Sequence, residues 1–283
     1  MKKKIGFIDL HIDEWHANNY PGWFRSLERY KDFELGYAWE ESPNPDGKNL
    51  EEWCKEFGMI PAASMEEVIE KSDALCVLAP SNPEAHERLS TLALQSGKPL
   101  YIDKTFAPDR ATAEKFFAIA EKYGTPLMSS SALRYGQELI DAMNTTFAED
   151  KPCFVSTFGG GSTFQEYSIH QIEMIVATMG LGAKSVTRVN CSGCSHFQVE
   201  YADGIRGAAM TYGSFGFSSV LNGKSGSAFL LQGSQMFENL LDRILEFYTT
   251  GISPIDKAET IEVAAIREAA LKADAEPGKT FAV

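Results

Sequence analysis

Short apolar runs alternate with amphipathic segments along the first half of the chain. Residues 74–79 (ALCVLA) are wholly apolar, a pattern that favours a strand buried on both faces of a parallel sheet. Ser64 and Glu67 form a capping-box pair at the start of a predicted helix, and Gly97 and Gly124 follow the ends of two others. Strands that alternate with helices predict right-handed crossovers and therefore an α/β fold with a doubly wound parallel sheet. The predicted strands cover residues 4–10, 33–39, 74–79, 99–103 and 126–129, and the predicted helices cover residues 15–29, 50–57, 64–71, 83–96 and 109–123.

The second half of the chain has a different pattern. A helix is predicted over residues 167–179, where Gly180 ends it. Longer segments of alternating polar and apolar residues follow, as is typical of antiparallel strands with one exposed face. They cover residues 185–191, 198–201, 205–212, 216–221 and 227–231, and helices over residues 236–248 and 258–273 close the chain. We therefore predict two domains: residues 1–135 with the parallel sheet, and residues 136–283, an α+β domain with a mostly antiparallel open sheet.

Charge and composition narrow the class of protein. The formal net charge of the 283 residues is −13, which argues against nucleic acid and anionic membranes as partners, because both select basic surfaces. No apolar stretch approaches the roughly 20 residues that span a bilayer. The basic start is interrupted by Asp9, His11 and Asp13, so we expect no signal peptide. Five cysteines, an odd number, indicate reduced thiols. These features predict a cytoplasmic protein that binds a small molecule.

An ordered set of motifs occupies residues 73–107. An apolar strand leads to Pro80, and His86 lies in the helix that follows. That helix ends at residues 97–99 (GKP), and the next strand leads into residues 103–105 (DKT). In the second domain, residues 166–180 (EYSIHQIEMIVATMG) continue the same set of motifs.

This ordered set resembles the Gfo/Idh/MocA family of NAD(P)-dependent oxidoreductases. The family has Glu-Lys-Pro where this chain has Asp103-Lys104-Thr105, and an Asp-x-x-x-His helix where it has Glu166 and His170. The resemblance implies a Rossmann-type first domain and hydride transfer between NAD or NADP and a sugar, inositol-like or other polyol substrate. It also implies homodimers or homotetramers that pack their open sheets face to face.

Glu166, His170 and Lys104 are the candidate catalytic residues. Glu166 and His170 are four positions apart, so on a helix they lie on one face. A carboxylate beside an imidazole orients the ring and raises its basicity, which suits a general base. Lys104 ends a predicted parallel strand, where ligands of doubly wound sheets bind. By the resemblance, Lys104 and His170 flank the carbon that exchanges hydride. The alternative is an exposed helical pair and a solvated lysine.

Four further residues are candidates for substrate binding. Glu173 continues the polar stripe of the Glu166–His170 helix, and Gln165 adds hydrogen-bonding capacity at its start. Arg134 is where the family often has an arginine near the active site, and a salt bridge at a domain interface is an equal alternative. Gly160 lies in a glycine-rich turn that, by the resemblance, leaves space for a polyol. Three glycines also simply permit a tight turn.

The turn after the first strand lacks the glycines of a dinucleotide-binding fingerprint. Asp9, His11 and Glu14 take the places of the three glycines, and no glycine lies between Gly6 and Gly22. A side chain there fills the space of the phosphate, and a carboxylate adds repulsion. The question is therefore whether this chain binds a dinucleotide at all.

Three hypotheses remain open. In the first, NAD or NADP still binds at the edge of the sheet: Glu40 or Glu41 binds the ribose hydroxyls and Pro80, Ser81 and Asn82 contact the dinucleotide. The other candidates at this edge are Asp9, His11, His86 and Asp103. In the second, the chain has lost dinucleotide binding and serves as a ligand-binding or regulatory protein. In the third, His11, Asp13 and His16 hold a metal ion for hydrolytic or lyase chemistry, against the alternative that His11 caps the loop and His16 faces it.

Overall fold

The computed structural model describes residues 2–231 and 233–283. The chain divides into two compact units. Unit 1 comprises Met1–Ala107, Ala111–Ser130 and Leu240–Asp256, and unit 2 comprises Pro108–Arg110, Ser131–Asn239 and Lys257–Val283. This division differs from a single boundary after residue 135, because most of helix α8 (Met236–Thr250) belongs to the first unit. Its apolar side chains, such as Leu241 and Ile244, are fully buried.

Unit 1 is built on a six-stranded parallel sheet in the order β3-β2-β1-β4-β5-β6. The predicted doubly wound parallel sheet is confirmed. The order reverses between β1 and β4, and ligands of such sheets bind at the carboxyl ends of the strands at this point. The strands are β1 (Lys3–Asp9), β2 (Phe33–Glu40), β3 (Ile60–Pro61), β4 (Ala74–Val77), β5 (Leu100–Ile102) and β6 (Leu127–Met128).

The helices of unit 1 begin and end largely where local signals place them. Ser64 Oγ accepts a hydrogen bond from the Glu67 amide and caps α3. Gly58, with φ 66°, ends α2 in the left-handed conformation that glycine adopts without strain. The helix predicted over residues 15–29 ends earlier, since the short 3₁₀ helix Glu28–Asp32 follows it. The helices are α1 (Trp15–Ser26), α2 (Leu50–Phe57), α3 (Met65–Lys71), α4 (Pro83–Ser90) and α5 (Arg110–Tyr123).

Unit 2 contains a seven-stranded sheet in the order β12-β11-β7-β10-β9-β8-β13. The strands pair antiparallel except for β7 and β10, which are parallel, so the predicted mostly antiparallel sheet is confirmed. The central strand β7 was not predicted. The strands are β7 (Phe154–Gly159), β8 (Ala183–Val189), β9 (Ser195–Tyr201), β10 (Gly207–Tyr212), β11 (Ser218–Gly223), β12 (Gly226–Leu231) and β13 (Thr280–Ala282).

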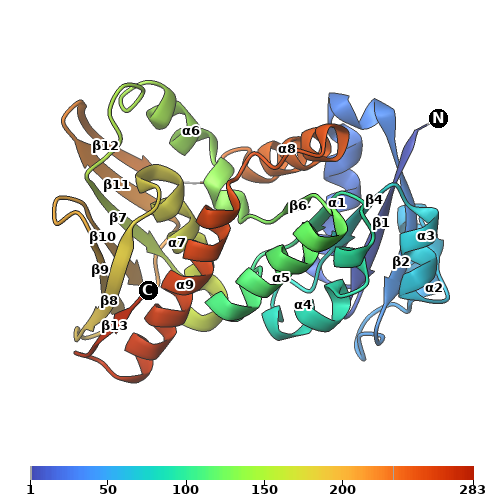
Figure 1. The fold of residues 1–283 in the computed structure, drawn as a ribbon, viewed down its shortest axis with the longest axis horizontal. Coiled ribbons are helices and arrows are strands. Elements are labelled where there is room, and N and C mark those ends of the chain that lie inside the picture. Colours follow the sequence, from blue (N-terminus) through green and yellow to red (C-terminus); the bar gives the residue numbers. More distant parts are fainter. Residues whose placement is uncertain (1, 232) are drawn as a thin grey trace. The chain divides into compact units, whose positions relative to one another are not determined.

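Helices α7 (Phe164–Met179) and α9 (Lys257–Ala275) cover one face of this sheet (Figure 1). The core between them joins Ile172 and Val176 of α7 to Val155, Phe197 and Met210 of the strands. Alternate residues of β7 and β12 point to the other face, where they are partly or fully exposed. Unit 2 also contains α6 (Gln137–Asn144) and the 3₁₀ helix η3 (Ala132–Tyr135). Within residues 2–231 and 233–283, no helix combines the length and the apolar character needed to cross a lipid bilayer.

Candidate active site

Asp9 lies at the carboxyl end of β1, at the point where the strand order reverses. Its side chain is fully buried. Oδ1 accepts hydrogen bonds from the amides of Leu10 at 2.6 Å and Ala79 at 3.0 Å. Burial raises the pKa of this carboxyl well above its usual value, and the nearby charge of Glu14 raises it further, although the amides lower it. Asp9 therefore ties the loop after β1 to the loop after β4.

Glu14 caps helix α1. Its carboxylate accepts hydrogen bonds from the amides of His16 at 2.9 Å and Ala17 at 2.6 Å. Burial raises the pKa of Glu14, against the lowering effects of the His16 charge and the two amides. The first free amides of a helix after β1 are the groups that bind a phosphate in dinucleotide-binding proteins. Here a side chain of the same chain already binds them.

The two residues predicted to bind the ribose also have partners within unit 1. Glu40 is buried, and its Oε2 accepts a hydrogen bond from the Ile12 amide at 3.0 Å. Glu41 forms a bidentate ion pair with Arg88, with Nη2 2.7 Å from Oε2 and Nε 2.8 Å from Oε1. Both carboxylates are therefore engaged at the end of β2.

A small cavity of about 60 Å³ lies beside the carboxyl groups of Asp9 and Glu14. It brings together five of the predicted cofactor residues, and its lining is Asp9, Leu10, His11, Glu14, Ala79, Pro80, Ser81 and Asn82. Pockets for organic ligands usually enclose about 300 Å³ or more, so this cavity is too small for a dinucleotide. The amides that would bind a diphosphate already donate hydrogen bonds to carboxylates of this chain. The carboxylate oxygens also surround the cavity with acceptors, so in this conformation the loop does not suit a diphosphate.

Asp103 is the centre of a buried polar network next to the cavity. Its carboxylate forms an ion pair with His16 Nδ1 and accepts hydrogen bonds from the hydroxyls of Tyr20 at 3.2 Å and Tyr101 at 3.0 Å. Burial would raise the pKa of Asp103, but the charge and hydrogen bond of His16 and the charge of Lys104 outweigh it, so the pKa lies below its usual value. Tyr20 and Tyr101 were not among the predicted site residues. A usable signal was the spacing of His16 and Tyr20, which share one face of α1.

Lys104 follows Asp103 at the carboxyl edge of the sheet. It is only 7% exposed, and its ammonium donates a hydrogen bond to the Pro80 carbonyl oxygen at 3.1 Å. The alternative of a solvated loop lysine is therefore wrong. A buried ammonium beside an ionised carboxylate can hold an oxygen atom of a ligand in a defined direction.

His86 joins two loops of unit 1 through its ring nitrogens. It is fully buried, with Nδ1 3.0 Å from the Phe106 carbonyl oxygen and Nε2 2.5 Å from the Leu78 carbonyl oxygen. Both ring nitrogens are engaged by the backbone, so His86 holds the loops after β4 and β5 together. This placement corrects the expectation that His86 contacts a cofactor.

The three predicted metal ligands each contact a different set of residues. His11 Nδ1 lies 2.8 Å from the Ser42 carbonyl oxygen. Asp13 accepts hydrogen bonds from Asn18 and from the Lys48 amide, each at 2.7 Å. His16 is paired with Asp103. Among the residues that the structure describes, no group of three His, Cys, Asp or Glu side chains is placed to hold a metal ion. The metal hypothesis drawn from the spacing is therefore not supported.

His170 is the candidate base in unit 2. It is half-buried on α7, and its Nδ1 is hydrogen-bonded to Ser131 Oγ at 2.6 Å. The rings of Tyr167 and Phe217 pack against the imidazole, with centroids 5.7 Å and 5.3 Å from its own. Ser131 is fully buried and was not predicted. The Glu166 carboxylate accepts a hydrogen bond from Ser162 Oγ at 2.6 Å. Ser131 is therefore a ring-orienting partner of His170.

Arg134 and Glu173 belong to an ion-pair network inside unit 2. Arg134 Nε lies 2.8 Å from Glu173 Oε2, and Nη1 lies 2.6 Å from Glu259 Oε2. Glu173 is only 5% exposed, so it is not part of an exposed polar stripe. Burial would lower the pKa of Arg134, but the two carboxylates raise it above its usual value. Arg134 thus forms salt bridges within unit 2, where a salt bridge at a domain interface was the alternative, and substrate binding by Arg134 and Glu173 stays a prediction.

The glycine-rich turn is close-packed. A Cβ atom on Gly160 would lie 2.0 Å from the Gly213 carbonyl oxygen, so the missing side chain makes room for backbone and not for a substrate. Gln165 is exposed, and its carbonyl oxygen accepts a hydrogen bond from Arg267 at 2.8 Å. Neither contact points to a polyol site.

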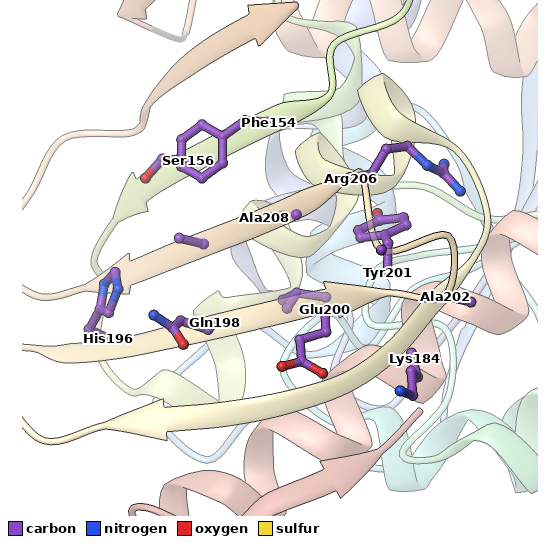
Figure 2. A pocket seen from close by; sticks show the side chains of 14 residues that line it. Phe154, Ser156, Lys184, His196, Gln198, Glu200, Tyr201, Ala202, Arg206 and Ala208 are labelled. Carbon is purple, nitrogen blue, oxygen red and sulfur yellow. The ribbon is translucent and has the colours of Figure 1, made fainter.

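A larger hollow of about 620 Å³ lies on the open face of the unit 2 sheet. Figure 2 shows His196, Gln198 and Glu200 presented from β9 and Ser156 from β7, with β10 between these two strands. His196 Nδ1 is hydrogen-bonded to Thr211 Oγ1 on β10 at 2.9 Å. None of the predicted catalytic, cofactor or substrate residues lines this hollow.

Comparison with known proteins agrees with the resemblance drawn from the motifs. Residues 31–131 match the model of the GFO_IDH_MocA family, described as an oxidoreductase family with an NAD-binding Rossmann fold. The Gfo/Idh/MocA match begins after the loop that lacks the glycines and includes residues 80–86 and 103–105. A search of curated proteins finds no match to the sequence.

Solved structures share the whole fold. Myo-inositol 2-dehydrogenase from Lactobacillus plantarum is 14% identical, with a TM-score of 0.80 over 100% of both chains. An oxidoreductase from Agrobacterium radiobacter, crystallised with NAD⁺, L-tartaric acid and magnesium, is 14% identical, with a TM-score of 0.76 over 100% of this chain and 98% of that one. Biliverdin reductase from Synechocystis, crystallised with biliverdin and NADP⁺, is 15% identical, with a TM-score of 0.68 over 98% of this chain and 99% of that one. At these identities the likeness establishes the fold.

Proposed function

We propose that this protein is a Gfo/Idh/MocA oxidoreductase that exchanges a hydride between NAD or NADP and a sugar, inositol-like or other polyol. The family match supports an oxidoreductase, and the likeness to a myo-inositol dehydrogenase supports the class of substrate. The observation that carries the proposal is the buried Lys104 ammonium at the carboxyl edge of the parallel sheet, beside the ionised Asp103.

Each proposed catalytic residue has a separate task. The Lys104 ammonium would hold the substrate oxygen and stabilise negative charge on it. His170 would accept the hydroxyl proton at Nε2. That role requires Nδ1 to carry the other ring proton and donate it to Ser131 Oγ, so Ser131 would select the reactive tautomer. NAD(P), when bound, would supply the redox chemistry.

A titration and an activity assay test the proposal together. Purified protein is titrated with NADH and NADPH while nicotinamide fluorescence and the melting temperature are followed. Binding should stabilise the fold by about 2 to 3 kcal/mol at 100 times the dissociation constant. Oxidation of myo-inositol or another polyol with NAD⁺ or NADP⁺ should follow. Absence of both binding and turnover at millimolar cofactor would contradict the proposal.

A second candidate function is ligand binding or regulation without a dinucleotide and without catalysis. The 60 Å³ cavity and the carboxylates around it favour this alternative. It predicts no response to NADH or NADPH together with thermal stabilisation by a polyol alone. The same titration, repeated with polyols in the absence of cofactor, separates the two functions.

We also propose that the protein forms a homodimer or homotetramer through the open face of the unit 2 sheet. Phe229 and Leu231 of β12 point to this face and are 69% and 70% exposed. Exposed apolar patches of this kind mark association surfaces. All five cysteines lie among the described residues as free thiols, which supports the proposed cytoplasmic location.

A further inference from the structure

Carboxylates accept the hydrogen bonds of the backbone amides in and around the β1–α1 loop. Glu14 accepts from the amides of His16 and Ala17, and Asp9 accepts from those of Leu10 and Ala79. Glu40, at the end of β2, accepts from the Ile12 amide. In a glycine-rich dinucleotide loop, the amides at the start of the helix face the pyrophosphate. The carboxylate of Glu14 is a chemical equivalent of that anion, since both are negatively charged groups that accept two amide hydrogen bonds.

We propose that Glu14 occupies the position of the dinucleotide pyrophosphate in unit 1, and so determines how weakly this chain binds NAD(P). The inference rests on the proposed function, because it concerns the cofactor of that reaction. Glu14 is an intramolecular competitor: a dinucleotide gains the α1 amides only when the Glu14 side chain leaves them.

Asp9 makes the same position unfavourable in a second way. Its Oδ2 is buried and has no hydrogen-bond partner among the described residues, while the side chain lines the 60 Å³ cavity. A buried carboxyl group at this wall offers a phosphate neither an amide nor a cation, and when it is ionised it repels the phosphate. The cavity therefore lacks the donors of a phosphate site.

Contacts with neighbouring strands and loops hold the loop in this conformation. Glu40 binds the Ile12 amide and His11 contacts the Ser42 carbonyl oxygen, so β2 and its following loop hold the residues before Glu14. The Glu14 amide in turn donates to the Ile12 carbonyl oxygen at 2.9 Å. Replacing the Glu14 side chain should therefore free the α1 amides without releasing the loop.

The test compares NADH binding to three variants with that to the wild-type protein, by fluorescence titration and calorimetry. Glu14→Ser keeps a residue favoured at helix N-caps but removes the charge. Glu14→Gln removes the charge and keeps the length. Asp13→Ser is the matched control, because Asp13 is the adjacent acid and binds Asn18 and the Lys48 amide instead of α1. We expect Glu14→Ser to lower the dissociation constant at least about tenfold, since the negative charge leaves the amides and a neutral hydroxyl competes for them less strongly than a carboxylate. Glu14→Gln should have a smaller effect, and Asp13→Ser should have none.

Several outcomes overturn the inference. One is a Glu14→Ser dissociation constant equal to that of the wild type, including the case in which neither protein binds. Another is an equal gain in Asp13→Ser, which would indicate general charge repulsion. If Glu14→Ser fails to fold, micromolar binding of NADH by the wild type would overturn the inference, and a wild-type affinity weaker than that would support it.

Polyol oxidation distinguishes failure of the inference from failure of the proposed function. If Glu14→Ser gains NADH affinity but no variant oxidises a polyol, the inference stands and the proposed function fails. If the wild type oxidises a polyol and Glu14→Ser binds NADH no better, the function stands and the inference fails.

Discussion

Most candidate side chains have partners within their own unit. This is so for Glu40, Glu41, His86 and Arg134. Lys104 donates a hydrogen bond to the Pro80 carbonyl oxygen and lies at the carboxyl edge of the parallel sheet, where ligands of such sheets bind. At the scale of single residues, the proposed chemistry depends on Lys104 and on His170.

The first prediction concerns turnover. Lys104→Ala and His170→Ala should each lower kcat by about 100-fold or more, because each removes a proton-transfer or charge-stabilising group. Steady-state kinetics measure the loss, and circular dichroism checks that the variants fold. His196→Ala, on the open sheet face, and Lys115→Ala, an exposed ion-pair lysine, are the controls and should retain activity. Full activity in either site variant would refute the assigned role.

The second prediction concerns the pH dependence of stability. The pKa of Asp9 is raised in the folded state, so Asp9 stabilises the fold below its usual pKa and this contribution is lost as pH rises through the raised value. The free energy of unfolding of the wild type, relative to Asp9→Asn, should therefore fall as pH rises above the usual range for aspartate. Urea unfolding at a series of pH values measures it.

Asp13 provides a control of opposite sign. Burial would raise the pKa of Asp13, but hydrogen bonds from the Lys48 amide and Asn18 hold it below its usual value. Its stabilising contribution is present above the usual aspartate pKa and lost as pH falls. The wild type should gain stability relative to Asp13→Asn as pH rises, and parallel trends for the two variants would contradict both assignments.

At the scale of elements, one ion-pair network joins three pieces of unit 2. Arg134 lies in η3, Glu173 in α7 and Glu259 in α9. The Glu173 side chain also accepts a hydrogen bond from the Ser131 amide at 3.2 Å. Because Ser131 binds His170, the network supports the segment that orients the proposed base.

The third prediction follows from the burial of this network. Arg134→Met would leave the Glu173 carboxylate buried without its cation, and should lower the free energy of unfolding by about 3 to 5 kcal/mol. Denaturant unfolding measures the change. Arg243→Met, which removes an exposed pair with Glu246, should cost no more than about 1 kcal/mol. Equal losses in the two variants would show that the network has no special role.

The elements also show how far periodicity alone can predict this fold. Strong alternation placed β8, β10 and β12, and glycine stops placed the ends of α5 and α7. Strand β7 was missed because Phe154–Gly159 runs directly into the glycine-rich turn, which conceals its alternation. The strand order, with β7 between β11 and β10, depends on pairings between residues far apart in the sequence.

At the scale of the whole molecule, the question is association. Register places Phe229 opposite Val220 and Val220 opposite Ser156, so these side chains form a row across β12, β11 and β7 on the open face. Leu231 begins a parallel row through Ser218. Phe229 and Val220 are therefore apolar neighbours on adjacent strands of this face, with Ser156 and Ser218 in the same two rows.

The fourth prediction tests the proposed homo-oligomer. The double substitution Phe229→Glu with Leu231→Glu should convert the oligomer to a monomer, because it places charges in the apolar row of the interface. Size-exclusion chromatography with light scattering measures the mass. Ile252→Glu is the control, since Ile252 is 73% exposed but lies in unit 1. A monomeric wild-type protein at high concentration would contradict the proposed interface.

By itself the sequence determined the two kinds of sheet, most helix ends and the presence of acids where a phosphate-binding loop has glycines. These features depend on periodicity and on residues a few positions apart, as when Glu14 caps the helix that begins at Trp15. Tertiary structure alone decided which polar side chains meet: Asp9 with Ala79, Ser131 with His170, and Arg134 with Glu259. The physical reason is that a buried polar atom must be paired by whatever group the fold brings near, and that group lies tens of residues away in the chain.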